Sequence, residues 1–211
     1  INSKTTENVK PVFENSDYIS FLGYIKYDSF DNKYFPKTGW YLTSDFQYFP
    51  YSTNYSKQFN NFSIVKGDIG FARTFFKKLA LNLQTEAGFA IGEKSVPYFD
   101  FVLGGYGYNT INNFRHFYGY DFLSLAGDSY LKSTVTVDYE FLKKNHINAS
   151  ANFANIEDNL FESTKWISTP QYSGYALGYG LETIIGPIEL KYTWSPETGK
   201  GLVWFNIGFW F

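Results

Sequence analysis

The last eleven residues, 201–211, most constrain what this chain can fold into. Large apolar side chains recur at every second position of GLVWFNIGFWF, namely at Val203, Phe205, Ile207, Phe209 and Phe211. A period of two is typical of a β-strand whose faces meet different surroundings. In water, such a strand at the end of a sheet would be an exposed, aggregation-prone edge. We therefore predict the closing strand of a transmembrane β-barrel, with these side chains against lipid. The alternative is a buried last strand of a soluble β-sandwich.

The same alternation recurs along the rest of the chain. It predicts eight further strands, at residues 18–28, 40–48, 62–75, 79–91, 130–143, 146–156, 172–185 and 188–194. Most exceed the about 5–6 residues of an average soluble strand and suit a tilted membrane strand. Tight and long connections alternate, as in outer-membrane barrels, tight at Lys77, Asn145 and Gly186 and long after Tyr48, Ile91 and Ile156. The predicted fold class is all-β, an antiparallel transmembrane β-barrel or half-barrel of about 8–10 strands.

Composition supports a membrane barrel and excludes several other classes. Aromatic residues make up 22% of the chain, an excess that two interfacial girdles would explain. No apolar run reaches the roughly 18 residues of a membrane helix, so strands must do any spanning. A net charge of −2 without a basic stripe argues against a nucleic-acid partner. Because there is no Cys, and His116 and His146 lie far apart, we expect no metal site and no cofactor.

The expected strands number nine, an odd count. The first and last strands would then run in the same direction, whereas a free-standing barrel with both ends in the periplasm needs an even number. Either the count is wrong by one, or the chain is the C-terminal half of a larger barrel, closed by preceding sequence or a second copy. We expect residues 1–17 to be a polar linker or loop and residues 18–211 the barrel. Since the chain starts at Ile1 and holds no Met, we also expect its natural start to be missing.

The polar faces of the predicted strands carry charges of both signs. These are Glu86, Asp138, Glu140, Glu182 and Glu189, with Lys66, Lys132 and Lys191. Two of the carboxylates could serve as a glycosidase pair, but a charged wall facing a water-filled lumen explains the whole set. On the same faces, Gly178 and Gly180 leave room for a plug or loop, or for strand curvature.

Four short motifs, in the right order, resemble the C-terminal half of the bacterial surface antigen superfamily. YFPKTG at 34–39 is similar to an F-P-x-x-G turn, with Pro36 and Gly39, and PYFDFVLGG at 97–105 is similar to the entry of a sixth extracellular loop. YGLETIIGPIELKY at 179–192 is similar to an L-G-P-I-R-L-x-Y hairpin. FNIGFW at 205–210 is similar to the final strand. The superfamily includes the barrel-assembly insertase and the transporters of two-partner secretion. The resemblance implies the outer membrane of a Gram-negative bacterium, contact with its lipid, and recognition of the terminal strand by the barrel-assembly machinery.

The resemblance also implies a latch inside the barrel. In this superfamily a V-R-G-F or V-R-G-Y motif in the sixth loop holds its Arg against carboxylates of the inner wall. Here that role falls to Arg115, in a loop that contains Gly104, Gly105, Tyr118 and Gly119. The sequence departs from the family at two places, because His116 follows the Arg and Asn155 replaces an inward Asp of the next strand. The candidate partners are Glu157, Asp158, Glu182, Asp138 and Glu140. The alternative is a solvated surface Arg.

Three functions follow from these observations. The first is protein translocation or insertion, or the anchoring and export of an attached passenger by type V secretion. The altered loop most resembles barrels attached to patatin-type lipid hydrolase domains. The chain is not itself expected to be an enzyme, because it has no G-x-S-x-G motif and a hydrolase site would lie upstream. The second is a passive outer-membrane pore or structural anchor, and the third a soluble ligand-binding sandwich. A translocator should need Arg115 held inside the barrel, whereas a simple pore should not.

Overall fold

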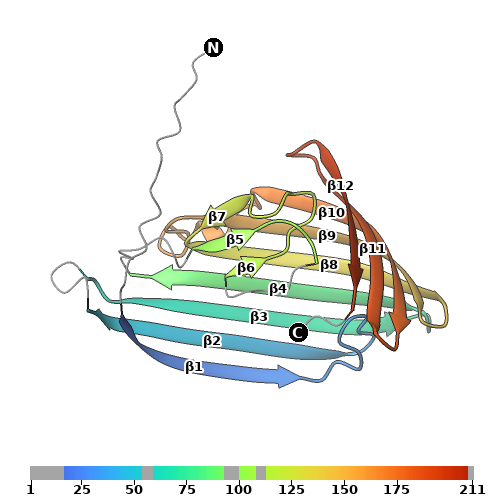
Figure 1. The fold of residues 1–211 in the computed structure, drawn as a ribbon, viewed down its shortest axis with the longest axis horizontal. Coiled ribbons are helices and arrows are strands. Elements are labelled where there is room, and N and C mark those ends of the chain that lie inside the picture. Colours follow the sequence, from blue (N-terminus) through green and yellow to red (C-terminus); the bar gives the residue numbers. More distant parts are fainter. Residues whose placement is uncertain (1–16, 54–58, 93–99, 108–112, 209–211) are drawn as a thin grey trace, which may run out of the picture.

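The fold is one large, curved antiparallel sheet with a small second sheet on its concave side (Figure 1). The structure is a computed structural model that describes residues 17–53, 59–92, 100–107 and 113–208. Within these residues the sheet has nine strands in the order β1-β2-β3-β4-β8-β9-β10-β11-β12. They are β1 (Tyr18–Asp28), β2 (Gly39–Ser52), β3 (Phe62–Phe75), β4 (Leu79–Ile91), β8 (Ser129–Leu142), β9 (Asn145–Glu157), β10 (Tyr172–Thr183), β11 (Gly186–Ser195) and β12 (Lys200–Ile207). All nine expected strands are therefore confirmed.

The sheet is apolar on its convex face and polar on its concave face. On β8, Val135, Val137 and Tyr139 are exposed, while Lys132 and Asp138, which point to the other face, are buried. A soluble sheet would bury the first set and expose the second. The predicted alternation thus describes a wall whose outside contacts an apolar solvent and whose inside faces a polar lumen. One sheet of this kind does not fit a soluble sandwich, which needs two facing sheets.

Strand boundaries differ from the predictions mainly at two places. β2 continues to Ser52, four residues past the predicted end, because Phe49 on its inner face packs against Phe62. β12 ends at Ile207, and the predicted continuation through Phe209 and Phe211 lies outside the described residues. The expected linker at residues 1–17 lies outside them too, except for Asp17.

The short second sheet comes from the longest connection, residues 92–128, which we call the inner loop. It comprises β5 (Phe101–Leu103), β6 (Phe114–Arg115) and β7 (Leu125–Gly127), with β5 in the middle. These strands were not predicted, since two or three residues are too few to show a period. The one helical segment in the described residues, η2 (Lys165–Ile167), is a single 3-10 turn, and no helix there has the length and hydropathy of a membrane span.

The sheet is open along two edges. β1 pairs with β2 alone and β12 with β11 alone among the described strands. Every neighbouring pair is antiparallel, so β1 and β12, first and ninth in order, run in the same direction. The concave-facing Leu22 and Tyr24 of β1 are 67% and 79% exposed, whereas the concave Lys132 and Asp138 of β8 are buried. In the part of the chain that the structure describes, the wall is therefore incomplete on this side.

Candidate functional site: the inner loop and its lumen contacts

The inner loop folds back into the lumen and carries a dry aromatic core. Phe101, Leu103 and Phe117 of the loop are fully buried. They pack against side chains of the inner wall, namely Phe49, Phe62, Ile64, Tyr130, Ala154 and Ile156. Gly88 of β4 makes room for this, because a Cβ there would lie 2.5 Å from Cζ of Phe101. The long-loop end of the lumen is thus filled by packed side chains.

Below this core, Arg115 takes part in a buried charge cluster. Its Nε lies 3.4 Å from Oε1 of Glu86, and the Glu86 carboxylate also pairs with the Lys132 ammonium. Glu86 on β4 and Lys132 on β8 are direct cross-strand partners. Lys132 also donates to the backbone oxygen of His116 at 3.1 Å, so the wall holds both residues of the loop. A buried carboxylate shared by two cations is neutralised at close range, which burial of charge requires.

The five carboxylates proposed as partners of Arg115 have other contacts. Glu157 pairs with Lys165, Asp158 accepts from the backbone of Asp128, Asp138 and Glu182 flank His146, and Glu140 pairs with Lys37. The sequence placed Glu86 on the inner face but did not connect it with Arg115. The register of β4 against β8 is what brings it under the loop.

The loop residues highlighted in the sequence lie at close backbone approaches. Gly119 has φ +76°, and a Cβ there would lie 2.2 Å from the carbonyl carbon of Trp194. Gly104, with φ +143°, approaches the backbone of Asp121 as closely, and Gly105, with φ +64°, exchanges backbone hydrogen bonds with the 117–120 turn. Tyr118 is buried, and the backbone of Gly174 passes directly beneath its carbonyl. Here only glycine permits the loop to lie against the wall.

A second polar contact was not anticipated. The buried hydroxyl of Tyr106 donates to Oε2 of Glu189 at 2.9 Å, and the Lys191 ammonium lies 4.4 Å from the centre of the Tyr106 ring. Glu189 and Lys191 alternate on the inner face of β11, as their spacing predicted, but nothing in the sequence indicated which loop residue meets them. Burial raises the pKa of Tyr106, so the phenol stays protonated and remains a donor.

Two titratable loop residues are shifted by this environment. Burial of the guanidinium opposes its charge, but the neighbouring Tyr130 hydroxyl and Glu86 carboxylate outweigh this and raise the pKa of Arg115. Burial lowers the pKa of His116 well below its ordinary value, and the charges of Lys132, Lys191 and Arg115 lower it further. The loop therefore presents a fixed cation beside a neutral imidazole.

Asn155, at the position where the superfamily has an inward Asp, has a different role. Oδ1 of Asn155 accepts from the backbone N–H of Gln171 at 2.8 Å, and its amide faces the backbone oxygen of Ser168 at 3.2 Å. It therefore stabilises the connection between β9 and β10 and is not one of the contacts described for Arg115.

The other turn motif is also built as the sequence indicated. Gly39 has φ +112°, and a Cβ there would lie 2.3 Å from the backbone oxygen of Ser29. Pro36 follows the buried Phe35 in the same turn. This turn lies at the end of the sheet that carries the tight turns, opposite the inner loop.

Comparison with known proteins gives a family. The family model described as the OMP85 superfamily matches residues 1–211. The chain belongs to the OMP85 superfamily. A crystal structure of BamA from Haemophilus ducreyi lacking POTRA domains 1-3 is similar, with a TM-score of 0.63 and 13% identity, over 84% of this chain and 38% of that chain. At this identity the likeness shows the fold alone. No curated protein matches the chain significantly.

Membership in the OMP85 superfamily confirms the resemblance seen in the sequence and makes this chain an outer-membrane β-barrel of that family. The convex face is accordingly the lipid face. Val203, Phe205 and Ile207 of the terminal strand are all more than half exposed on it. The chain spans 38% of the similar BamA structure. The described residues contain no group of three or more His, Asp or Glu that could hold a metal ion.

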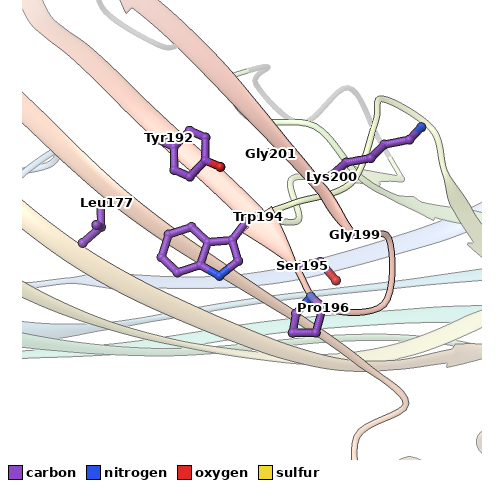
Figure 2. A pocket seen from close by; sticks show the side chains of 8 residues that line it. All are labelled: Leu177, Tyr192, Trp194, Ser195, Pro196, Gly199, Lys200 and Gly201. Atoms are coloured by element: carbon purple, nitrogen blue, oxygen red, sulfur yellow. The ribbon is translucent and has the colours of Figure 1, made fainter.

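On the OMP85 lipid face, a shallow groove of about 480 Å³ crosses β10, β11 and β12 (Figure 2). Tyr192 and Trp194 form its wall, and Gly201 opens it, since a Cβ there would lie 2.1 Å from the Tyr192 hydroxyl. Lys200 points away from the rings and pairs with Asp121 of the inner loop at 3.1 Å (Figure 2). The groove is thus mainly aromatic and aliphatic, as expected next to acyl chains.

Proposed function

We propose that this OMP85 barrel serves protein translocation across, or insertion into, the outer membrane of a Gram-negative bacterium, including the export of an attached passenger. The observation that carries the proposal is the contact of Arg115 with Glu86, backed by Lys132, inside the lumen. A loop held in this way acts as a brace, and its removal should alter the stability and export activity of the barrel. A simple diffusion pore does not need such a brace. The proposal keeps the role of the family latch but gives it a different carboxylate.

The alternative, a passive pore, is less well supported. A diffusion pore needs a continuous polar channel. Here fully buried Phe101, Leu103 and Phe117 fill the lumen beside β2, β3 and β8. A structural anchor without translocation activity remains the competing role, and it differs from the main proposal in not needing Arg115.

For the passenger, we propose a patatin-like lipid hydrolase domain on the N-terminal side of the whole barrel, before the strands that complete it. The support is the resemblance of the inner loop to barrels of that type. In this arrangement the barrel residues 18–211 perform no catalysis and hold no cofactor.

For closure of the barrel, we propose strands from preceding sequence in the same chain. β1 and β12 run in the same direction, so joining β12 of one copy to β1 of a second copy would give a parallel seam. An antiparallel barrel needs an odd number of added strands between them. The C-terminal barrel signal, Val203, Phe205, Ile207, Phe209 and Phe211, would then be read by the assembly machinery as the last strand of a single chain. One natural chain per particle in detergent supports this proposal, and two chains would contradict it.

The function is tested by replacing Arg115. In the complete natural protein, Arg115→Ala should reduce passenger export, measured as passenger on the cell surface at equal barrel abundance. Arg73→Ala is the matched control, because Arg73 is the other Arg of the chain and is exposed on β3. Unchanged export and unchanged heat stability of Arg115→Ala would exclude the brace and favour the structural anchor.

A further inference from the structure

The turn between β1 and β2 crosses the lumen. We call residues 29–38 the mouth strap. It leaves the sheet at one edge, yet its side chains bond to β8 and β10 on the facing wall. The two contacts join residues 103 and 150 positions apart. Figure 1 shows this loop rising from the ends of β1 and β2 toward the adjacent ends of β10 and β11. An ordinary hairpin turn has no such reach.

At its centre, Phe35 is inserted into a fitted socket. The ring is 4% exposed and stacks on the His146 imidazole, with centroids 4.2 Å apart and planes inclined by 11°. Gly180 forms the floor, because a Cβ there would lie 2.5 Å from Cζ of Phe35. Any side chain at that position would push the ring out.

The socket is charged around its rim. Nδ1 of His146 lies 2.7 Å from Oδ2 of Asp138, and Nε2 lies 3.2 Å from Oε1 of Glu182. Only the doubly protonated ring can donate from both nitrogens. An imidazolium under a parallel Phe35 ring adds a cation–π attraction to the packing.

Two further side chains tie the strap to the same wall. Nδ2 of Asn32 donates to Oε1 of Glu182 at 3.1 Å. Nζ of Lys37 lies 2.6 Å from Oε2 of Glu140, and this hydrogen bond raises the pKa of Lys37. The strap is also shaped in advance, since Oδ1 of Asp31 accepts from the backbone N–H groups of Lys37 and Thr38.

We propose that the mouth strap is a second closure of the lumen, a gate at the end opposite the inner loop. It blocks ions and extended polypeptide while Phe35 sits in its socket, and it opens when the Phe35 and Lys37 contacts break together. The inference does not depend on the proposed function, because an anchor without export activity would carry the same gate.

The contacts make this gate weaker than the inner-loop brace. The side chains of Lys37 and Glu140 are 33% and 20% exposed, and ion pairs that water reaches contribute only about 0–1 kcal/mol. Lys132, in contrast, is fully buried against Glu86. Between the two closures lies a polar cavity of about 170 Å³ that Asp68, Glu86 and Arg115 help to line. We therefore expect the strap to open while the inner loop stays in place.

The test is the conductance of the complete natural protein in planar lipid bilayers. The double variant Phe35→Ala, Lys37→Ala should open several-fold more often than the wild type. Lys33→Ala is the matched control, because it removes an exposed lysine from the same strap, and it should conduct like the wild type.

A bridging experiment keeps the test independent of misfolding. The 211 residues contain no Cys. Lys37→Cys combined with Glu140→Cys therefore gives one defined pair of thiols that a cleavable bis-maleimide can cross-link. Bridging should suppress openings, and cleavage of the reagent should restore them. Folding of the double alanine variant is checked by its migration on a gel before heating. The gate is excluded if the folded variant conducts like the wild type. It is equally excluded if bridging leaves openings unchanged. Export assays read the inner-loop brace separately.

Discussion

Nε of Arg115 lies 3.4 Å from Oε1 of Glu86, on the strand that leads directly into the inner loop. The other cation on this carboxylate, Lys132, belongs to the strand that leaves the loop. The loop is therefore fixed over the seam between the two strands that carry it. Because one buried carboxylate balances two cations, the three residues should respond to substitution very differently.

Glu86→Gln should be the most damaging single change in this cluster. It removes the ion-pair partner of the buried Lys132 ammonium, and breaking a buried pair in this way typically costs about 3–5 kcal/mol. Arg115→Ala should cost less, since Glu86 keeps Lys132. The two variants can be ranked by the temperature at which half of the protein has lost its compact, fast-migrating form on a gel. Glu157→Gln, a change at a carboxylate paired with an exposed lysine, should shift it little. A larger effect from Glu157 than from Glu86 would contradict the assigned partner.

Gly119→Ala should displace the inner loop from the wall. Its φ of +76° disfavours other residues, and its Cβ would overlap the Trp194 backbone, which cannot rotate away. Gly199→Ala is a close control, because its φ is +63° but nothing lies within 4 Å of its Cβ position. Both variants share a backbone strain of about 1–3 kcal/mol. Only Gly119→Ala should make the inner loop sensitive to added protease. If Gly199→Ala made it equally sensitive, backbone strain alone, and not the overlap with Trp194, would be the cause.

Docking of the inner loop should weaken as the pH falls. Burial lowers the pKa of His116, so the undocked loop binds a proton that the docked loop does not. Stability is then fully present above the ordinary histidine value of about 6.5 and is lost as the pH falls toward the lower docked value. Heat stability measured from pH 8 to pH 5 should fall in the wild type and fall less in His116→Phe. Identical slopes would remove His116 as the cause.

The backbone amides on the open side of β1 should be protected in the complete natural protein. If preceding strands complete the barrel, these amides pair and exchange with deuterium as slowly as those of β3, which has neighbours on both sides. Fast exchange along β1 alone would show that the edge stays open. The exposed Leu22 and Tyr24 should likewise resist surface labelling.

Much of the wall could be predicted from the sequence because a period of two is a local signal. Val135, Val137 and Tyr139 alternate with Thr134, Thr136 and Asp138, and no distant contact is needed to interpret that. The wall positions of Glu86, Glu189 and Lys191 followed in the same way. What could not be predicted is which loop residue meets which wall residue. Arg115 meets Glu86, and Tyr106 meets Glu189, through the path of a loop with no period of its own.

The placement of Phe35 shows the same limit. Gly180 indicated that something could approach the inner face closely, and YFPKTG indicated a turn. Phe35 and Gly180 are 145 positions apart in the chain, and only the curvature of the whole sheet brings them together. A contact of that kind depends on tertiary closure, which no local pattern records.

The position of the Arg115 cluster has a consequence for the order of assembly. Glu86, Arg115 and Lys132 all lie between the start of β4 and the end of β8, two adjacent strands, whereas Tyr106 and Glu189 are 83 positions apart. Contacts of short sequence separation form early because less chain entropy must be lost first. Time-resolved cross-linking during folding should therefore capture the contact of Arg115 with Glu86 before the contact of Tyr106 with Glu189. On this account the loop is not pushed into a finished lumen: the last strands fold around it, and it serves as their mould.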